Sequence, residues 1–326
     1  MSVRSLLWGG AFAFVAIYPS TTLAQAPWIP PKGEVDVAVT YQWLDSDRHW
    51  LSNLTGSELT PLEIALGTDF QSNSLDVGRT QSHALVVDGD VGITDRLALT
   101  GSLAFIAARY RGAFPEQEIA DNGAFHASVQ DLQVGARYMV AGDLWAFTPF
   151  TSFTTPVADY EVLAHAAQGL GLTMLEIGAS VGRILLVNGA AKGYLQGTYG
   201  YSFTESPIED VSLNRSRATL EAGFFLGRRL AVQALTSWRR VHGGLEWSDA
   251  VFRGHEHFAG HDQSAATREW RYGAGVSFQL TNETSVELSY GEFIRGANTH
   301  DARTIAIGMS WGFQAFGGQT IGGGFK

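Results

Sequence analysis

The sequence predicts an all-β fold, a transmembrane antiparallel up-and-down β-barrel of about 12 strands. First, large apolar residues alternate with small or polar ones in segment after segment, as lipid-facing strands require. Second, the connections are alternately short and long, which is typical of barrels with short periplasmic turns and long extracellular loops. Third, no apolar run of about 20 residues, the length of a membrane-spanning helix, follows the N-terminal region.

The N-terminal residues have the layout of a secretory signal peptide. A basic start at Arg4 precedes the apolar run 6–18, and small residues lead up to Ala24. This run is too short to cross a bilayer as a helix. We therefore predict a signal peptide over 1–24, export of the mature chain from Gln25, and a single barrel domain over 25–313.

Segments with alternating character recur along the whole mature chain. An even number of them lets both ends of the barrel lie on the periplasmic side. The predicted strands cover residues 34–43, 85–93, 97–105, 131–140, 145–153, 175–181, 195–203, 217–226, 230–239, 269–280, 286–290 and 304–313.

Turn chemistry supports the short connections, most strongly at Asn188-Gly189, a favoured hairpin pair. Pro149 interrupts the fifth segment, and its facing stays open. The last segment places Ile305, Trp311 and Phe313 on one face, and we expect it to pair with residues 35–43. Closure is required because hydrocarbon offers no partners for an open sheet edge.

Composition narrows the range of functions. The 326 residues include no cysteine, so an exported chain must gain stability from packing or from a closed hydrogen-bond ladder. The net charge of −10 argues against a nucleic-acid partner. The expected partners are outer-membrane lipid and lipopolysaccharide, the barrel assembly machinery and a small-molecule solute. The oligomeric state stays open.

Charged residues fall on the inward face of the predicted strands. Twelve strands enclose more space than eight and less than the sixteen of open porins, so we expect a lumen, which loops could obstruct. Two interpretations remain: salt bridges that stiffen the wall, or a solute path between acidic and basic strips. The signs are mixed, so strong ion selectivity is not predicted. The lumen-lining candidates are Asp88, Asp90, Asp131, Arg137, Glu176, Arg217, Glu221, Arg239, Glu269, Arg271 and Glu287.

Three histidines of the fifth external loop are candidate metal ligands. His255, His257 and His261 have a spacing at which imidazoles could hold zinc or copper. Histidine is also common in polar loops, and that alternative remains. No cofactor is predicted.

Two external loops contain apolar stretches suited to short helices. Residues 60–67 and 159–169 each begin with a capping residue and end at a glycine. Such helices would either pack on one another as a lid, or line a hydrophobic site or plug the lumen.

We find no sequence motif for catalysis. His300, Asp301, Ser128 and Asp131 can be combined into a catalytic set, but nothing in the sequence favours that set over others. We predict that the protein is not an enzyme.

Several segments resemble a family of proteobacterial outer-membrane barrels related to the transporters of the MetA-pathway of phenol degradation. The resemblance rests on Gln130–Tyr138, Thr148-Pro-Phe150 with Asp159-Tyr160, His242-Gly-Gly244 and Asn298-Thr-His300. It implies a β-barrel and passage of small molecules, aromatic ones included, and it brings no catalytic residues. The Gly-rich tail 314–326 departs from the family by continuing past the terminal Phe313.

The function we expect is therefore passive passage of small, hydrophobic or aromatic molecules through a channel or transporter in the outer membrane of a Gram-negative bacterium. The alternative is a structural or surface-interaction barrel with a filled lumen. A lipid-modifying enzyme is the least favoured reading.

Overall fold

The computed structural model describes residues 26–52, 72–75, 78–112, 122–160, 162, 166–188, 190–245 and 261–316. The predicted signal peptide 1–24 and most of the tail, 317–326, lie outside this part, and so does the first apolar loop stretch, 60–67. The boundaries proposed for the signal peptide, barrel and tail therefore stay predictions.

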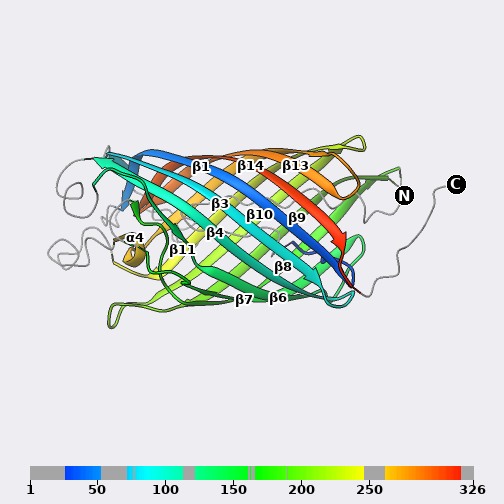
Figure 1. Ribbon diagram of the computed structural model, residues 1–326, viewed down its shortest axis with the longest axis horizontal. Coiled ribbons are helices and arrows are strands. Elements are labelled where there is room, and N and C mark those ends of the chain that lie inside the picture. Colours follow the sequence, from blue (N-terminus) through cyan, green and yellow to red (C-terminus); the bar gives the residue numbers. More distant parts are fainter. Residues whose placement is uncertain are drawn as a thin grey trace, which may run out of the picture.

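Twelve antiparallel strands close into a barrel, as predicted (Figure 1). Each strand pairs with the next, and the last pairs with the first. Val35 lies opposite Phe313, and Trp43 opposite Ile305, in the expected closing register. The strands are β1 (Glu34–Ser52), β3 (Gly78–Gly92), β4 (Leu97–Gly112), β6 (Leu132–Tyr138), β7 (Trp145–Thr155), β8 (Met174–Val187), β9 (Ala190–Thr204), β10 (Leu213–Leu226), β11 (Leu230–Gly243), β12 (Arg268–Gln279), β13 (Thr284–Ala297) and β14 (Thr299–Gln314).

Two short strands were not predicted. β2 (Ser72–Leu75) pairs with the far end of β1. β5 (His126–Val129) pairs with β4 ahead of β6, so β5 and β6 continue one strand across a break at Gln130 and Asp131. Both residues at the break are buried, which interrupts the alternation that sequence reasoning depends on.

The two ends of the barrel differ. We call the end with connections such as 93–96 and 280–283 the short-turn end; β1 begins and β14 ends there (Figure 1). The opposite, long-loop end carries connections such as 53–77 and 244–267.

One loop differs from the expected alternation. A long connection was expected before the last strand, but Asn298 alone separates β13 from β14. Its φ of 52° is left-handed, a conformation that asparagine tolerates better than most residues. Pairing between the two strands stops at Glu292 and Arg303, and beyond it β13 continues on β12 and β14 on β1. Strand extension therefore takes up the residues that were assigned to a loop.

The outer surface of the barrel is apolar, and the inner surface is small and polar. Leu99, Phe105, Leu220 and Ile307 are among the large apolar side chains exposed on the outside. Strand alternation turns serine, threonine and charged residues inward. This distribution is the reverse of a water-soluble fold and is what a barrel surrounded by lipid needs.

The facing of β7, which Pro149 left open, is now defined. Trp145, Phe147 and Phe153 are exposed on the outside, whereas Thr148 and Phe150 are buried inside. Pro149 lies within the ladder opposite Ala179 of β8.

Helix is scarce in the described part of the chain. α4 (His261–Ser264) is a single turn at the long-loop end. No helix in the described residues is long and apolar enough to cross a membrane.

Candidate solute-binding cavity

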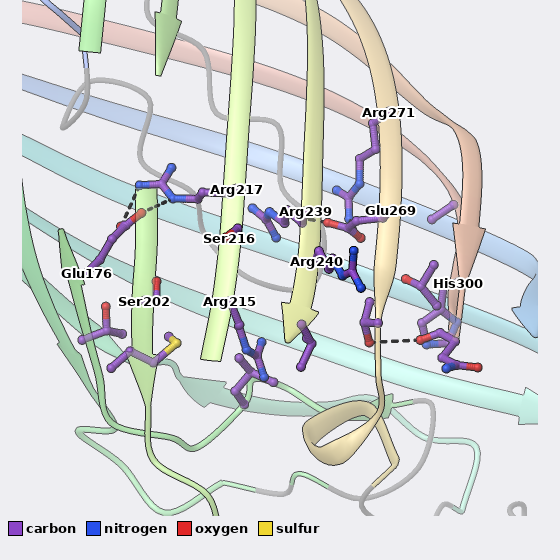
Figure 2. A pocket seen from close by; sticks show the side chains of 18 of the residues that line it. Glu176, Ser202, Arg215, Ser216, Arg217, Arg239, Arg240, Glu269, Arg271 and His300 are labelled. Carbon is purple, nitrogen blue, oxygen red and sulfur yellow. Dashed lines mark hydrogen bonds and ion pairs between the residues drawn. The ribbon is translucent and has the colours of Figure 1, made fainter. Parts of the chain in front are cut away.

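A cavity opens inside the long-loop half of the barrel (Figure 2). It contains about 1310 Å³ free of protein atoms, part of which is open to solvent. Alternation along the strands from β8 to β12 turns a charged wall toward this space. The wall consists of Glu176 from β8, Arg215 and Arg217 from β10, Arg239 from β11, and Glu269 and Arg271 from β12.

Glu176 and Arg217 form a paired contact across the wall. Nε of Arg217 donates to Oε1 of Glu176 at 2.5 Å, and a terminal guanidinium nitrogen donates to Oε2 at 2.7 Å. Gly200 of β9 lies opposite Arg217, and a Cβ at that position would meet Oε1 of Glu176 at 1.9 Å. The glycine therefore leaves the space into which the carboxylate extends.

Replacing Gly200 with alanine should break this contact. The added methyl group displaces Glu176 from Arg217, and overpacking of this kind costs about 1–3 kcal/mol. Samples are heated to a series of temperatures before gel electrophoresis, and the folded band is followed. We expect the midpoint temperature at which this band is lost to be lower for the variant. Gly197→Ala is the matched control on the same strand, because its Cβ would make ordinary contacts at 3.5 Å or more. Equal midpoints for the two variants would contradict the steric argument.

Glu269 is shared between two arginines. A terminal nitrogen of Arg271 donates to Glu269 at 2.6 Å, whereas Nε of Arg239 lies 3.4 Å from the same carboxylate. Arg239 also lies directly opposite Arg217 in the ladder, an arrangement of like charges that is unfavourable by itself. The Arg271 guanidinium lies 4.0 Å from the ring centre of Phe293, within the range of a cation–π contact.

The third external loop folds into the barrel. Tyr160 donates to Asp131 and accepts from the backbone N–H of Gly171 at 2.8 Å. Burial, together with the hydrogen bond to Asp131, raises the pKa of Tyr160, so its hydroxyl remains a donor. Leu170 of the same loop is buried and lines the cavity.

Of the helix expected over 159–169, residues 161 and 163–165 lie outside the described part of the chain; Ala166 has 3-10 conformation, and the other described residues of the stretch are irregular. Tertiary contacts explain the difference. Tyr160 bonds to Asp131, and the carbonyl of Gln168 accepts from the side-chain amide of Gln130. Both contacts hold the loop against the barrel wall, and Leu170, directly after this stretch, lines the cavity.

Two apolar clusters flank the charged wall. Leu44, Phe293 and Ala302 form one, on β1, β13 and β14. The other consists of Leu170, Leu172, Leu213 and Val241, with Met174 packed against it. Members of both clusters line the cavity, so it combines a charged wall with apolar flanks.

The short-turn half of the lumen has the opposite charge. Its inward carboxylates are Asp36, Asp88, Asp90, Glu221 and Glu287. Asp36 and Asp90 lie directly opposite one another on β1 and β3. Arg137 donates to Asp90, and their side chains are only 1% and 5% exposed.

A segment ahead of β1, Ala26–Trp28, lies inside the short-turn mouth. Arg137 donates to the carbonyl of Ala26, and the Thr148 hydroxyl donates to that of Pro27 at 2.6 Å. Gly182 of β8 provides the space for the segment, because a Cβ there would lie 2.5 Å from atoms of both Pro27 and Trp28. The segment therefore fills part of the lumen on the side of β7 and β8.

All eleven lumen candidates occupy inward positions, but in two separate groups. Glu176, Arg217, Arg239, Glu269 and Arg271 line the cavity, and Asp131 borders it through the third loop. Asp88, Asp90, Arg137, Glu221 and Glu287 lie nearer the short-turn end. Their part in a solute path is argued below as a proposal.

The candidate metal ligands lie mostly outside the described residues. His255 and His257 fall there, and His261 begins α4. Within the described part of the chain, no group of three or more histidine or carboxylate side chains is arranged to hold a metal. The metal site stays a prediction.

Two members of the candidate catalytic set, Ser128 and Asp131, have hydrogen-bond partners outside the set. Ser128 donates to the carbonyl of Val129 at 3.0 Å, and Asp131 accepts from Tyr160. A different pair, Ser216 and His242, is hydrogen-bonded at 2.6 Å on the outer side of β10 and β11. Ser216 is only 2% exposed, and its hydroxyl also contacts that of Tyr199 at 3.0 Å.

Comparison with known proteins finds no matching family model and no matching curated protein. Among solved structures, the fold is similar to the COG4313 outer membrane channel from Pseudomonas putida F1, with a TM-score of 0.61, 12% identity, and coverage of 88% of this chain and 97% of that chain. The NanC porin has a TM-score of 0.46 and 9% identity, covering 85% of this chain and 98% of that chain. The CymD monoaromatic hydrocarbon channel has a TM-score of 0.42 and 10% identity, covering 87% of this chain and 90% of that chain. At 12% identity, the likeness to the COG4313 channel establishes the barrel fold.

Proposed function

We propose that this protein is an outer-membrane channel or transporter for the passive passage of small molecules, hydrophobic or aromatic ones among them. The observation that carries the proposal is the cavity inside a closed barrel whose outer surface is apolar. A pocket with apolar flanks and a few charged groups is suited to a small organic molecule. The fold likeness to an outer-membrane channel is consistent with this role.

The proposal includes a cellular route. The chain would be exported by its signal peptide and inserted by the barrel assembly machinery. It would then contact outer-membrane lipid and lipopolysaccharide through its apolar surface.

Reconstitution into planar lipid bilayers tests the channel function. We expect discrete current steps, and partial block of the current by 3-phenylpropanol, an uncharged aromatic solute that fits the cavity. Deleting residues 58–68 of the first external loop should alter the conductance, because loops one and three are proposed to gate the mouth. An unchanged conductance after deletion would remove loop one from the gate.

A structural barrel with a filled lumen remains the second candidate, since one observation favours it. The Ala26–Trp28 segment lies in the lumen and bonds to Arg137 and Thr148 of the barrel wall. The absence of any current step from correctly folded protein would favour this alternative.

A further inference from the structure

We propose that the cavity binds amphipathic anions, molecules that carry a carboxylate on an apolar body. This inference rests on the proposed channel function and names its solute class. It begins with a charge imbalance. Four inward arginines, Arg215, Arg217, Arg239 and Arg271, face two glutamates in the wall, Glu176 and Glu269.

The remaining carboxylate at the cavity, Asp131, does not restore the balance. It accepts a hydrogen bond from Tyr160, and even with its charge included the arginines outnumber the acids. Excess charge in a confined space is costly unless a counter-charge is present. A bound anion supplies that counter-charge.

Arg239 is the arginine best placed to receive the anion. Arg217 directs two nitrogens to Glu176, and Arg271 has a close contact with Glu269. Arg239 reaches Glu269 only at 3.4 Å, and Arg215, Arg217 and Arg271 all lie within electrostatic range of it. Figure 2 shows Arg239 between Arg217 and Glu269 along the wall.

A second donor adjoins this position. Nε of Arg271 is buried and has no hydrogen-bond partner among the described residues, although the residue is only 5% exposed. Unsatisfied buried donors are rare and costly, and in a binding site they mark a place for a ligand acceptor. Glu269 already lies between Arg239 and Arg271, so a ligand carboxylate would satisfy this donor by sharing the position with Glu269 or by displacing it.

The apolar flanks define the rest of the ligand. Leu44, Phe293 and Ala302 line one side of the cavity, and Leu170 and Val241 the other. A small inorganic anion would leave these surfaces wet, and a polyhydroxylated acid would bury hydroxyls against them without partners. An alkyl or aryl body fits both sides.

The distribution of charge along the lumen favours anions over cations in the cavity. The arginine wall attracts an anion to the long-loop half, whereas the short-turn half presents mainly carboxyl groups, which offer an anion no counter-charge. An amphipathic cation experiences the opposite field, so it should bind weakly in the cavity.

Three probes with one skeleton test the proposal: 3-phenylpropionate, 3-phenylpropanol and 3-phenylpropylamine. Binding to the full mature protein in detergent is measured by titration calorimetry, with protein-free micelles as the blank. We expect the propionate to bind at least about tenfold more tightly than the alcohol, and the amine to bind most weakly. Arg239→Gln should reduce propionate affinity about tenfold and leave the alcohol unchanged.

Arg79→Gln is the matched control, because Arg79 pairs with Asp45 at 2.7 Å with its side chain 55% exposed and does not line the cavity. If Arg239→Gln fails to give a heat-modifiable folded band, Arg215→Gln takes its place. Propionate binding no tighter than alcohol binding would overturn the anion proposal and leave the channel function standing. Loss of both current steps and alcohol binding would instead contradict the proposed function.

Discussion

Deleting residues 26–28 should raise the single-channel conductance about two- to threefold, because the deletion removes backbone and an indole ring from the short-turn mouth of the lumen. The segment is held by Arg137 and Thr148, and Trp28 Nε1 donates to the carbonyl of Asp143 at 3.2 Å. Arg137 keeps its partner Asp90 in the deletion, so the barrel wall remains paired.

The variant Thr148→Val tests whether the hydrogen bond to Pro27 holds the segment in the mouth, while the segment itself stays present. Valine has nearly the shape of threonine but lacks the hydroxyl that bonds to Pro27 at 2.6 Å. In this variant the Ala26–Trp28 segment is complete but held less firmly, so we expect it to leave the mouth more often. Each departure should appear as a brief rise to the conductance of the deletion variant. The measurement is current recording in planar bilayers, with heat-modifiable mobility as the check on folding. A conductance unchanged by the deletion would show that ions bypass the segment.

The wall of the barrel could be predicted because strand alternation is a local property. In a strand, side chains two positions apart point to the same face, so the apolar character of Ile305 and Ile307 is enough to predict that both face outward. The closing register at Val35 and Phe313 followed from the same pattern, since both ends of the sheet must pair. Where alternation breaks, at Pro149 and at Gln130, prediction was incomplete.

The cavity could be predicted only in part, because its assembly depends on contacts between distant segments. The charged residues of the wall were identified from alternation, but their division into a basic half and an acidic half needs the register between strands. The inward fold of the third loop depends on Tyr160 reaching Asp131, and the insertion of Ala26–Trp28 depends on Thr148 and Gly182. None of these contacts has a local sequence signal. Phe293 lies outside the segment assigned to the eleventh strand, and its place in the cavity was missed for that reason.

Replacing Arg137 with methionine should destabilise the barrel by about 3–5 kcal/mol, the cost expected when one partner of a buried ion pair is removed. Arg137 is 2% exposed and is the inward arginine beside Asp90. Without it, Asp90 and the opposite Asp36 would remain as two neighbouring carboxylates with no cation from this residue. The free energy of unfolding is measured by denaturant titration of the protein in lipid vesicles, followed by tryptophan fluorescence.

A double variant distinguishes charge from packing in this result. Arg137→Met combined with Asp90→Asn removes both charges, and replacing a whole buried pair is often nearly neutral. We therefore expect the double variant to recover most of the lost stability, whereas Arg79→Gln, which opens an exposed pair, should leave it nearly unchanged. If the double variant is as unstable as Arg137→Met alone, the cost comes from the lost volume and the lost bond to Ala26. In that case the segment inside the mouth, rather than the ion pair, is what Arg137 stabilises.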